Sequence, residues 1–217
     1  MKEMDSAALT NVLLLVPVFL FALSFHEYAH AWVAFRRGDP TAFEMGRLSM
    51  HPLAHADLVG TLLLPIICIS QGWPFIGWAK PVPVNYSKLK NRKWDSALVA
   101  LAGPGANILL SIVATALLAV LLRTPMEHKI LETVQLLTVI SIQINLMLAF
   151  FNLIPIPPLD GFLVAQAFVP GRFSNILRTL TNPMKWLLLI LLLTGGFRFL
   201  LIPTNYVFRL CLRIAGV

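Results

Sequence analysis

Two histidines and a glutamate lie within the segment SFHEYAHAWVAF, residues 24–35, near the end of a strongly apolar stretch. His26, Glu27 and His30 form the pattern H-E-x-x-H. On a helix with about 3.6 residues per turn, positions i and i+4 share a face, so both imidazoles can bind one metal ion while the glutamate reaches a water beside it. The pattern also arises by chance in soluble helices, but an unpartnered carboxylate is costly in an apolar span. Spacing and surroundings together predict a metal centre.

A catalytic zinc ion takes three protein ligands and leaves one position for water, so we expect a third ligand on another element. The segment FNLIPIPPLDG, residues 151–161, begins with Asn152 and offers that ligand in Asp160. Its three prolines end a helix and hold the backbone extended. Irregular backbone is tolerated at membrane depth where it lines a cavity or is covered by protein. The alternative is a loop in which Asp160 only caps a helix that begins near Gly161.

The composition indicates a membrane protein. The 217 residues are 58% hydrophobic and 12% charged, with a mean hydropathy of +0.78, whereas soluble domains carry about 25% charged residues. The net charge of +7 comes from Lys and Arg in loops between apolar segments. That distribution is typical of cytoplasmic loops in membrane proteins, and no nucleic-acid partner is expected. We expect an all-α polytopic membrane protein with a single membrane-embedded domain over residues 1–217.

The lengths of the apolar segments define the expected membrane elements. A bilayer span needs about 20 apolar residues, and the segments that can supply one are 11–35, 95–122, 131–154 and, near the C-terminus, 184–202. We expect the core of the domain over 11–165 and a C-terminal helical segment over 184–217. The final residues, FRLCLRIAGV, suit the membrane interface because arginines are spaced among apolar residues.

The segment LVGTLLLPIICIS, residues 58–70, is short and contains Pro65. Apolar segments of about 10 to 14 residues are usually re-entrant or interfacial. Basic loops flank this one on both sides, and both are expected in the cytoplasm, so we predict that the segment enters the membrane and returns. Helix 11–35 then runs from outside to inside. Its cytoplasmic end meets that of helix 131–154, which brings Asp160 toward the H-E-x-x-H pattern.

Residues 45–51, MGRLSMH, alternate apolar and polar side chains from Arg47 onward, which predicts a strand. The segment WAKPVPVNY also alternates, but its prolines confine it to a sheet edge. A small membrane-associated β-loop of this kind could hold an extended substrate by strand addition, with Leu48 and Met50 beside it. The alternative is an amphipathic loop that lies on the lipid headgroups.

These motifs resemble the site-2 protease family of intramembrane zinc metalloproteases, in its compact bacterial subgroup without PDZ or CBS domains. The likeness covers residues 20–165 and rests on HEYAH, on NLIPIPPLDG and on AGPGAN, which is similar to the family's G-P-x-x-N element. GDPTAFEMGRL and GWAKPVPVN resemble the compact subgroup. His51 departs from it, since asparagine is expected there, and Gly105 occupies a position where bulkier apolar residues are usual.

The resemblance implies one bound zinc ion and a role for each motif residue. The implied roles are zinc ligation by His26, His30 and Asp160, base catalysis by Glu27, stabilisation of the oxyanion or of the substrate backbone by Asn152, and substrate contact by Leu48, Met50 and Asn107.

The expected function is that of a zinc metalloendopeptidase that hydrolyses peptide bonds within or near transmembrane segments, in regulated intramembrane proteolysis. Its expected place is the cell membrane, as a multi-pass protein with the active site toward the cytoplasm, and its expected partners are transmembrane substrates and lipid. The sequence leaves the oligomeric state open. One alternative is an inactive zinc-binding scaffold or chaperone, which would not need Glu27. Another is a transporter, which would carry charges along several spans. His51 and His55, four residues apart, could also form a second metal site.

Overall fold

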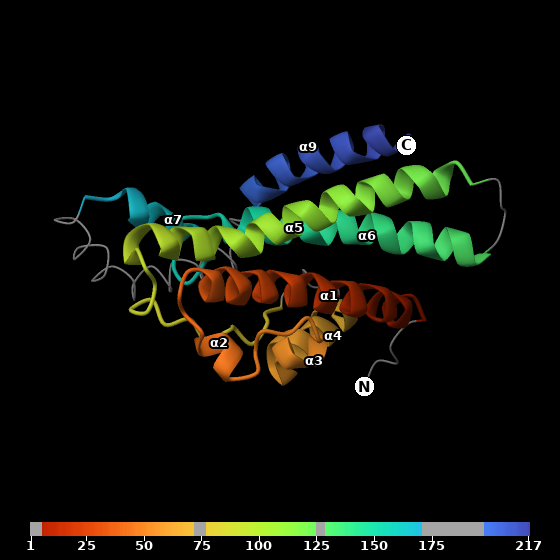
Figure 1. Ribbon diagram of the computed structural model, residues 1–217. Coiled ribbons are helices and arrows are strands. Elements are labelled where there is room, and N and C mark those ends of the chain that lie inside the picture. Colours follow the sequence, from red (N-terminus) through yellow and green to blue (C-terminus); the bar gives the residue numbers. More distant parts are fainter. Residues whose placement is uncertain (1–5, 72–76, 125–128, 171–197) are drawn as a thin grey trace.

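Three long apolar helices form the centre of the molecule. The computed structural model describes residues 6–71, 77–124, 129–170 and 198–217. Within them, three helices are long and apolar enough to cross a membrane: α1 (Ser6–Arg36, apolar from Val12), α5 (Arg92–Leu122) and α6 (Lys129–Asn152). They pack against one another, with α1 and α6 running opposite to α5, so the ends of α1 and α6 and the start of α5 lie at the same end of the bundle (Figure 1). At three of the four predicted spans, the structure confirms a helix that is long and apolar enough to cross a membrane.

The packing of α5 separates a protein-facing side from a lipid-facing side. Ala114 and Leu118 of α5 are buried against Ile142 and Leu146 of α6. Large apolar side chains on the rest of α5 stay exposed: Leu109, Ile112, Val113, Leu117 and Val120. Apolar surface of this extent on a long helix is explained by contact with lipid tails, and small residues at helix contacts let the backbones approach closely.

Helix α9 (Arg198–Ala215) packs on α5 and α6, with Ala215 in their shared core (Figure 1). It contains the start of the FRLCLRIAGV segment that the sequence assigned to the membrane interface. The predicted fourth span, 184–202, falls mostly on residues 171–197, outside the described part of the chain. The C-terminal span therefore stays a prediction.

A sharp turn follows α6 and positions the next helix. α6 ends at Asn152, and α7 (Asp160–Phe168) begins after the proline-rich break, as the prolines predict. A Cβ on Gly161 would lie 2.2 Å from the carbonyl oxygen of Leu153, so only glycine fits where the chain folds back. α7 packs against α5, and the side chain of Asp160 is 17% exposed.

Short helices cover the other side of α1 (Figure 1). They are α2 (Thr41–Glu44), α3 (Pro52–His55), the π-helical η1 (Leu58–Leu63) and α4 (Leu64–Ser70). The start of the apolar segment 58–70 is hydrogen-bonded to the loop that follows the segment, since Trp78 N–H donates to Gly60 O at 3.0 Å and Thr61 Oγ1 donates to Trp78 O at 2.8 Å. Gly60 and Trp78 therefore lie side by side, and re-entry of the segment stays a prediction.

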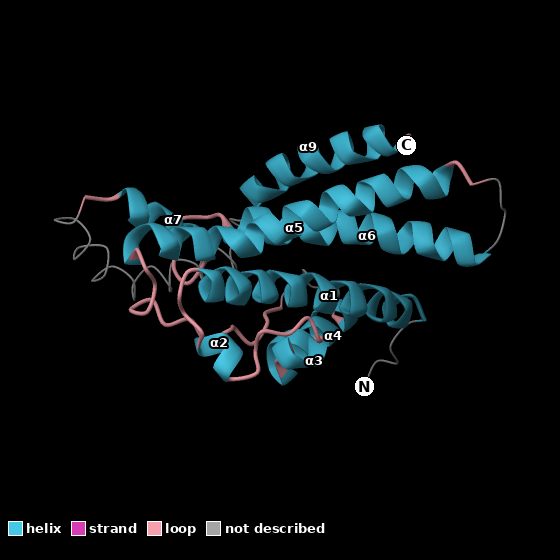
Figure 2. Ribbon diagram, viewed as in Figure 1, coloured by secondary structure: helices cyan, strands magenta, loops and turns pink. Residues whose placement is uncertain are grey.

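The expected β-loop does not form a ladder. Figure 2 shows helices and loops but no strand among the described residues, and the segments 45–51 and 77–85 are non-helical coil there. Pro81 and Pro83 lack the N–H groups that a ladder needs. Side chains take over the remaining backbone groups, because Arg47 Nη2 donates to Lys80 O at 2.9 Å and Val82 N–H donates to a glutamate.

Candidate metal centre

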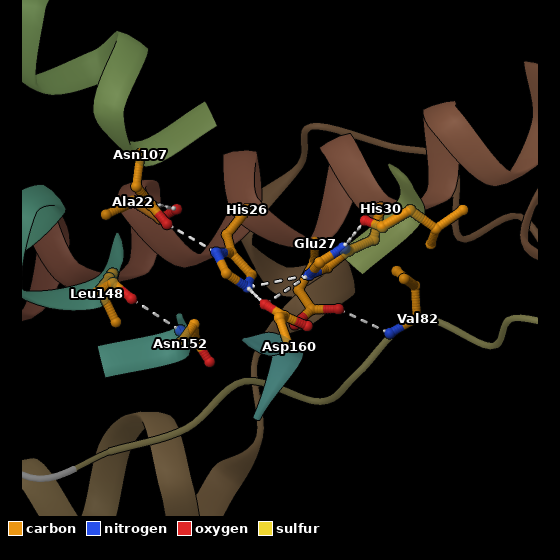
Figure 3. A network of polar contacts seen from close by, with 10 residues as sticks. Ala22, His26, Glu27, His30, Val82, Asn107, Leu148, Asn152 and Asp160 are labelled. Carbon is orange, nitrogen blue, oxygen red and sulfur yellow. Dashed lines mark hydrogen bonds and ion pairs between the residues drawn. The ribbon is translucent and has the colours of Figure 1, made fainter. Parts of the chain in front are cut away.

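Three side chains from two distant parts of the chain converge on one point (Figure 3). His26 and His30 lie one turn apart on α1, and Asp160 is the first residue of α7. The two Nε2 atoms are 3.0 Å apart, and Asp160 Oδ2 lies 3.2 Å from His26 Nε2 and 3.3 Å from His30 Nε2. Among the described residues, these three are the group whose ligand atoms lie close enough together to hold a metal ion. All three proposed zinc ligands are thus brought together.

The second ring nitrogen of each histidine fixes its tautomer. His30 Nδ1 lies 2.7 Å from the carbonyl oxygen of Val99, so it must donate. His26 Nδ1 lies 2.6 Å from Asn107 Oδ1. The amide of Asn107 is oriented by its Nδ2, which donates to Ala22 O and to a second asparagine, so its oxygen faces the ring. Both imidazoles therefore carry the proton on Nδ1, and both Nε2 atoms present lone pairs.

Three lone pairs facing one another without a hydrogen between them repel, unless a cation lies among them. Asp160 Oδ2 is buried and receives no hydrogen bond from the described residues, and a buried carboxylate oxygen without a partner is costly. Two neutral imidazoles and a carboxylate are ligands that zinc prefers. Around a tetrahedral ion at about 2.0–2.1 Å, ligand atoms are roughly 3.3 Å apart, close to the observed separations. The donor set fits zinc.

Helix α5 approaches the histidines at a glycine. A Cβ added to Gly103 would lie 2.4 Å from His30 Nε2 and 2.6 Å from His26 Nε2. Any side chain here would occupy the space of the metal ligands, so the position requires glycine for close approach rather than for backbone freedom. The same construction on Gly105, two residues later, meets nothing within 4 Å.

A buried relay of amides supports His26 from behind. Asn107 Nδ2 donates to Asn145 Oδ1 at 2.8 Å, and Asn145 Nδ2 donates to Ser141 O at 2.9 Å. Both asparagines have 0% exposed surface. The sequence assigned Asn107 to substrate contact, whereas the structure places it behind a ligand. Asn145 was not identified from the sequence, although an amide side chain within an apolar span is a signal, because such groups need partners.

Glu27 lies beside the ligands on the same helix and is largely buried. Its Oε2 accepts a hydrogen bond of 2.8 Å from the backbone N–H of Val82 (Figure 3). Asn152, at the end of α6, donates from Nδ2 to Leu148 O at 3.0 Å. One N–H of the Asn152 amide is thus engaged within its own helix, and the second N–H remains available for a contact with a substrate.

The remaining predicted residues lie on the loop beside α1. Leu48 packs against the buried cluster of Ala31, Ala42 and Val82, and Met50 is exposed. His51 is the residue before α3, and the buried His55 donates from Nε2 to Ser49 O at 2.6 Å. No second metal-binding group is formed by His51 and His55 among the described residues.

An open hollow of about 430 Å³ lies next to this region. It is lined by Thr41, Pro83, Val84, Asn85, Tyr86, Ser87 and Arg92. Burial raises the pKa of the Tyr86 hydroxyl, and the negative charges of Asp160, Asp39 and Glu27 raise it further. Tyr86 thus stays a protonated donor. It packs against the cluster that contains Ala34, four residues after the ligand His30 on α1, so the hollow lies near the metal centre.

Comparison with known proteins agrees with this geometry. Residues 123–194 match the model of Peptidase family M50. The chain is 38% identical over 158 residues to YwhC of Bacillus subtilis, a proposed zinc metalloprotease, and the match covers 72% of this chain and 69% of that protein. It is 27% identical over 186 residues to Rip2 of Mycolicibacterium smegmatis, also a proposed zinc metalloprotease, covering 84% of this chain and 67% of that one.

No solved structure matches the chain with significant similarity. The match to YwhC, which extends over more than two thirds of both chains, is sufficient to assign the family. The chain therefore belongs to peptidase family M50, the site-2 protease family of zinc metalloproteases.

Proposed function

We propose that this protein is an intramembrane zinc endopeptidase that hydrolyses peptide bonds within or near the transmembrane segments of other membrane proteins. The observation that carries the proposal is the position of the metal centre. His26, His30 and Asp160 meet inside a bundle whose outer helix faces are apolar. A substrate that reaches such a site must itself be in or at the bilayer.

The side chains around the centre can divide the work of hydrolysis. Bound zinc would supply a Lewis acid that lowers the pKa of water and polarises the scissile carbonyl. Glu27 takes the proton of the attacking water and passes it to the leaving amine. Asn152 donates to the developing oxyanion with the N–H that Leu148 O does not accept. Loss of one such donor typically lowers the rate by about 10² to 10³.

Water needs a route to a site at this depth. His30 and Glu27 lie roughly 10–15 Å before the end of α1, at about 1.5 Å per residue. The hollow beside Tyr86 is at this end, since Tyr86 packs against Ala34 near the end of α1. We infer that water reaches the metal centre from this hollow rather than across the lipid-facing surface.

The end of the bundle that holds the site is assigned to the cytoplasm. Basic residues gather at this end, at the last residue of α1 and in the loops beyond it, and include Arg36, Arg37, Lys88 and Lys90. The proposed re-entry of the segment 58–70 is supported by the hydrogen bond from Trp78 N–H to Gly60 O, because it holds the loop after the segment beside the start of the segment. The flanking basic loops can then both be cytoplasmic.

The substrate class follows from the same position. A transmembrane helix has its carbonyls bonded internally and must be unwound before attack, so segments with helix-weakening residues near the cytoplasmic boundary are the favoured substrates. Cleavage there would release a cytoplasmic fragment, which is the output expected in regulated intramembrane proteolysis.

The function is tested by Glu27→Gln. This variant keeps the size of the side chain and all three zinc ligands but removes the base. We expect it to bind one zinc per chain and to lose cleavage, so that its substrates accumulate as intact membrane proteins in quantitative proteomics of cells carrying the variant. Wild-type cleavage by this variant would contradict the mechanism. An unchanged membrane proteome, with zinc bound in both proteins, would favour the zinc-binding scaffold.

A further inference from the structure

We propose that the backbone N–H of Val82, on a segment held in place by Arg47, positions the catalytic base Glu27. The inference rests on the proposed peptidase function. It adds a positioning group from the loop 77–85. Val82 has an apolar side chain without a hydrogen-bond donor or acceptor, so the sequence gives no sign of such a role.

The contact itself is short and buried. Val82 N–H donates to Glu27 Oε2 at 2.8 Å, and both residues are 9% exposed. A hydrogen bond from a backbone N–H to a carboxylate is charge-assisted and stronger than one between neutral groups. Because a carboxylate has two oxygens, fixing Oε2 assigns the other, Oε1, to the proton of the attacking water. The bond therefore selects one orientation of the base.

The local sequence leaves a single donor for this purpose. In the run Lys80-Pro81-Val82-Pro83-Val84, Pro81 and Pro83 have no N–H. Val82 thus carries the one backbone N–H between Lys80 and Val84. Proline on either side also fixes φ and restricts the preceding residue to extended conformations, so the donor is presented on a stiff backbone.

Contacts on both sides of Val82 hold the segment against the protein. Arg47 Nη2 donates to Lys80 O at 2.9 Å and lies 3.4 Å from Pro81 O. Lys80 N–H donates to His55 O at 2.9 Å. On the other side, Asn85 N–H donates at 2.6 Å to a carboxylate oxygen of the buried Asp39.

The side chain of Val82 adds a further constraint, because it packs in a buried cluster with Ala31 and Ala42. Ala31 lies on α1, four residues after Glu27. The helix that carries the base therefore also contributes to the cluster in which Val82 packs.

A second explanation of the same contact has the opposite consequence. The N–H of Val82 meets Glu27 where the leaving amine of a substrate would, so the segment could be an inhibitory cap that must be displaced. The contacts to Arg47, His55 and Asp39 argue against displacement, since all of them would break together. The two explanations predict opposite effects on the rate of cleavage. Loss of the N–H lowers the rate if the bond positions the base and raises it if the segment is an inhibitory cap.

The decisive experiment deletes the one donor. Val82→Pro removes the N–H while keeping an extended backbone, and replacing Val82 by its α-hydroxy analogue through nonsense suppression exchanges the N–H for an ester oxygen without altering the side chain. The matched controls are Val84→Pro and the same ester at Val84. The N–H of Val84 forms no hydrogen bond with the part of the chain that the structure describes, and Val84 packs against the same cluster.

Activity is measured on purified, zinc-loaded, full-length protein in liposomes. The probe is a fluorogenic peptide with the sequence of a transmembrane segment, taken from a membrane protein that accumulates in Glu27→Gln cells. We expect both Val82 variants to lower kcat roughly 10- to 100-fold, the range that misplacement of a catalytic group produces. KM and zinc content should stay within about twofold of the controls. Arg47→Met should lower kcat in the same direction, and Arg47→Lys, which keeps a donor, should recover part of the loss.

The outcomes separate this inference from the function on which it rests. If wild-type protein does not cleave the probe faster than Glu27→Gln, the proposed function fails. If wild-type protein cleaves and the Val82 variants match the Val84 controls, or cleave faster, the positioning role is overturned. If Val82→Pro loses zinc through misfolding, the ester decides, because it retains the side chain and the backbone geometry.

Discussion

At the metal centre, each ligand histidine has its Nδ1–H engaged by an oxygen before any metal arrives. Val99 O holds His30 and Asn107 Oδ1 holds His26. This arrangement orients both rings and increases the basicity of Nε2, as the second shell of a metal site generally does. The cost is an apo site with converging lone pairs. The metal is therefore expected to contribute to the stability of the folded bundle as well as to the chemistry.

Gly103 provides the sharpest test of this site. Gly103→Ala puts a methyl group 2.4–2.6 Å from the two Nε2 atoms, so we expect loss of stoichiometric zinc binding. Gly105→Ala, on the same helix with open space at its Cβ, should bind zinc as wild type does and should leave the helix at least as stable, since alanine favours helix more than glycine does. Zinc content of the two purified proteins by mass spectrometry checks this. Equal zinc in both would mean that α5 does not approach the histidines as closely as described.

Some of these residues could be predicted from the sequence and others could not. His26, Glu27 and His30 could be predicted because helical periodicity alone places them together. The prediction of Asp160 as a ligand needed two further inferences: that the prolines end the preceding helix, and that the first and third spans end on the same side of the membrane. Val82 could not be predicted, because its contribution is a backbone N–H and no side-chain pattern reports where a backbone group points.

At the scale of the secondary-structure elements, a chain of hydrogen bonds that joins three helices holds the metal ligand His26 in place. Asn145 on α6 bonds Asn107 on α5, which bonds His26 on α1. The relay couples the spacing of the helices to the tautomer of a metal ligand. Buried polar networks of this kind are strong when every member is satisfied and costly when one is removed.

Breaking the relay at its far end should weaken the metal site without touching a ligand. Asn145→Leu removes both the amide that orients Asn107 and the bond to Ser141 O. We expect about a 10- to 100-fold loss of zinc affinity, the usual effect of an outer-shell change, measured by competition with a chromogenic chelator.

The control for this change is Thr138→Val, two turns earlier on the same face of α6. Thr138 is equally a buried polar residue, but its hydroxyl bonds Val134 O within its own helix. It should bind zinc like wild type. An Asn145→Leu protein with unchanged zinc affinity would show that Asn107 is oriented without α6.

The elements themselves were predictable to different degrees. Hydropathy located α1, α5 and α6 to within about five residues, because a long apolar run has one stable form in lipid. Residues 45–51 alternate as a strand does, yet the expected strand is absent from the described structure. Alternation shows which side chains face inward, whereas a ladder also needs donors on its partner, and Pro81 and Pro83 supply none.

For the molecule as a whole, orientation in the membrane follows from loops rather than from helices. The three spans are apolar along most of their length, so they do not distinguish one leaflet from the other. The basic loops do. The proposed re-entry of the segment 58–70 would allow both of its flanking basic loops to lie on one side, and the hydrogen bond from Trp78 N–H to Gly60 O brings the following loop back to the start of the segment.

Cysteine accessibility in intact cells tests the orientation. In a background of Cys68→Ser and Cys211→Ser, single cysteines replace Glu44, Ser87 and Thr124. The first two flank the segment 58–70, and the third follows α5. We expect a membrane-impermeant maleimide to label position 124 in intact cells and positions 44 and 87 only after the membrane is opened. Labelling of 44 and 87 from opposite sides would show that the segment 58–70 crosses the bilayer, because an odd number of crossings must separate them. The metal centre, which includes residues on both sides of that segment in sequence, would then need a different topology to assemble.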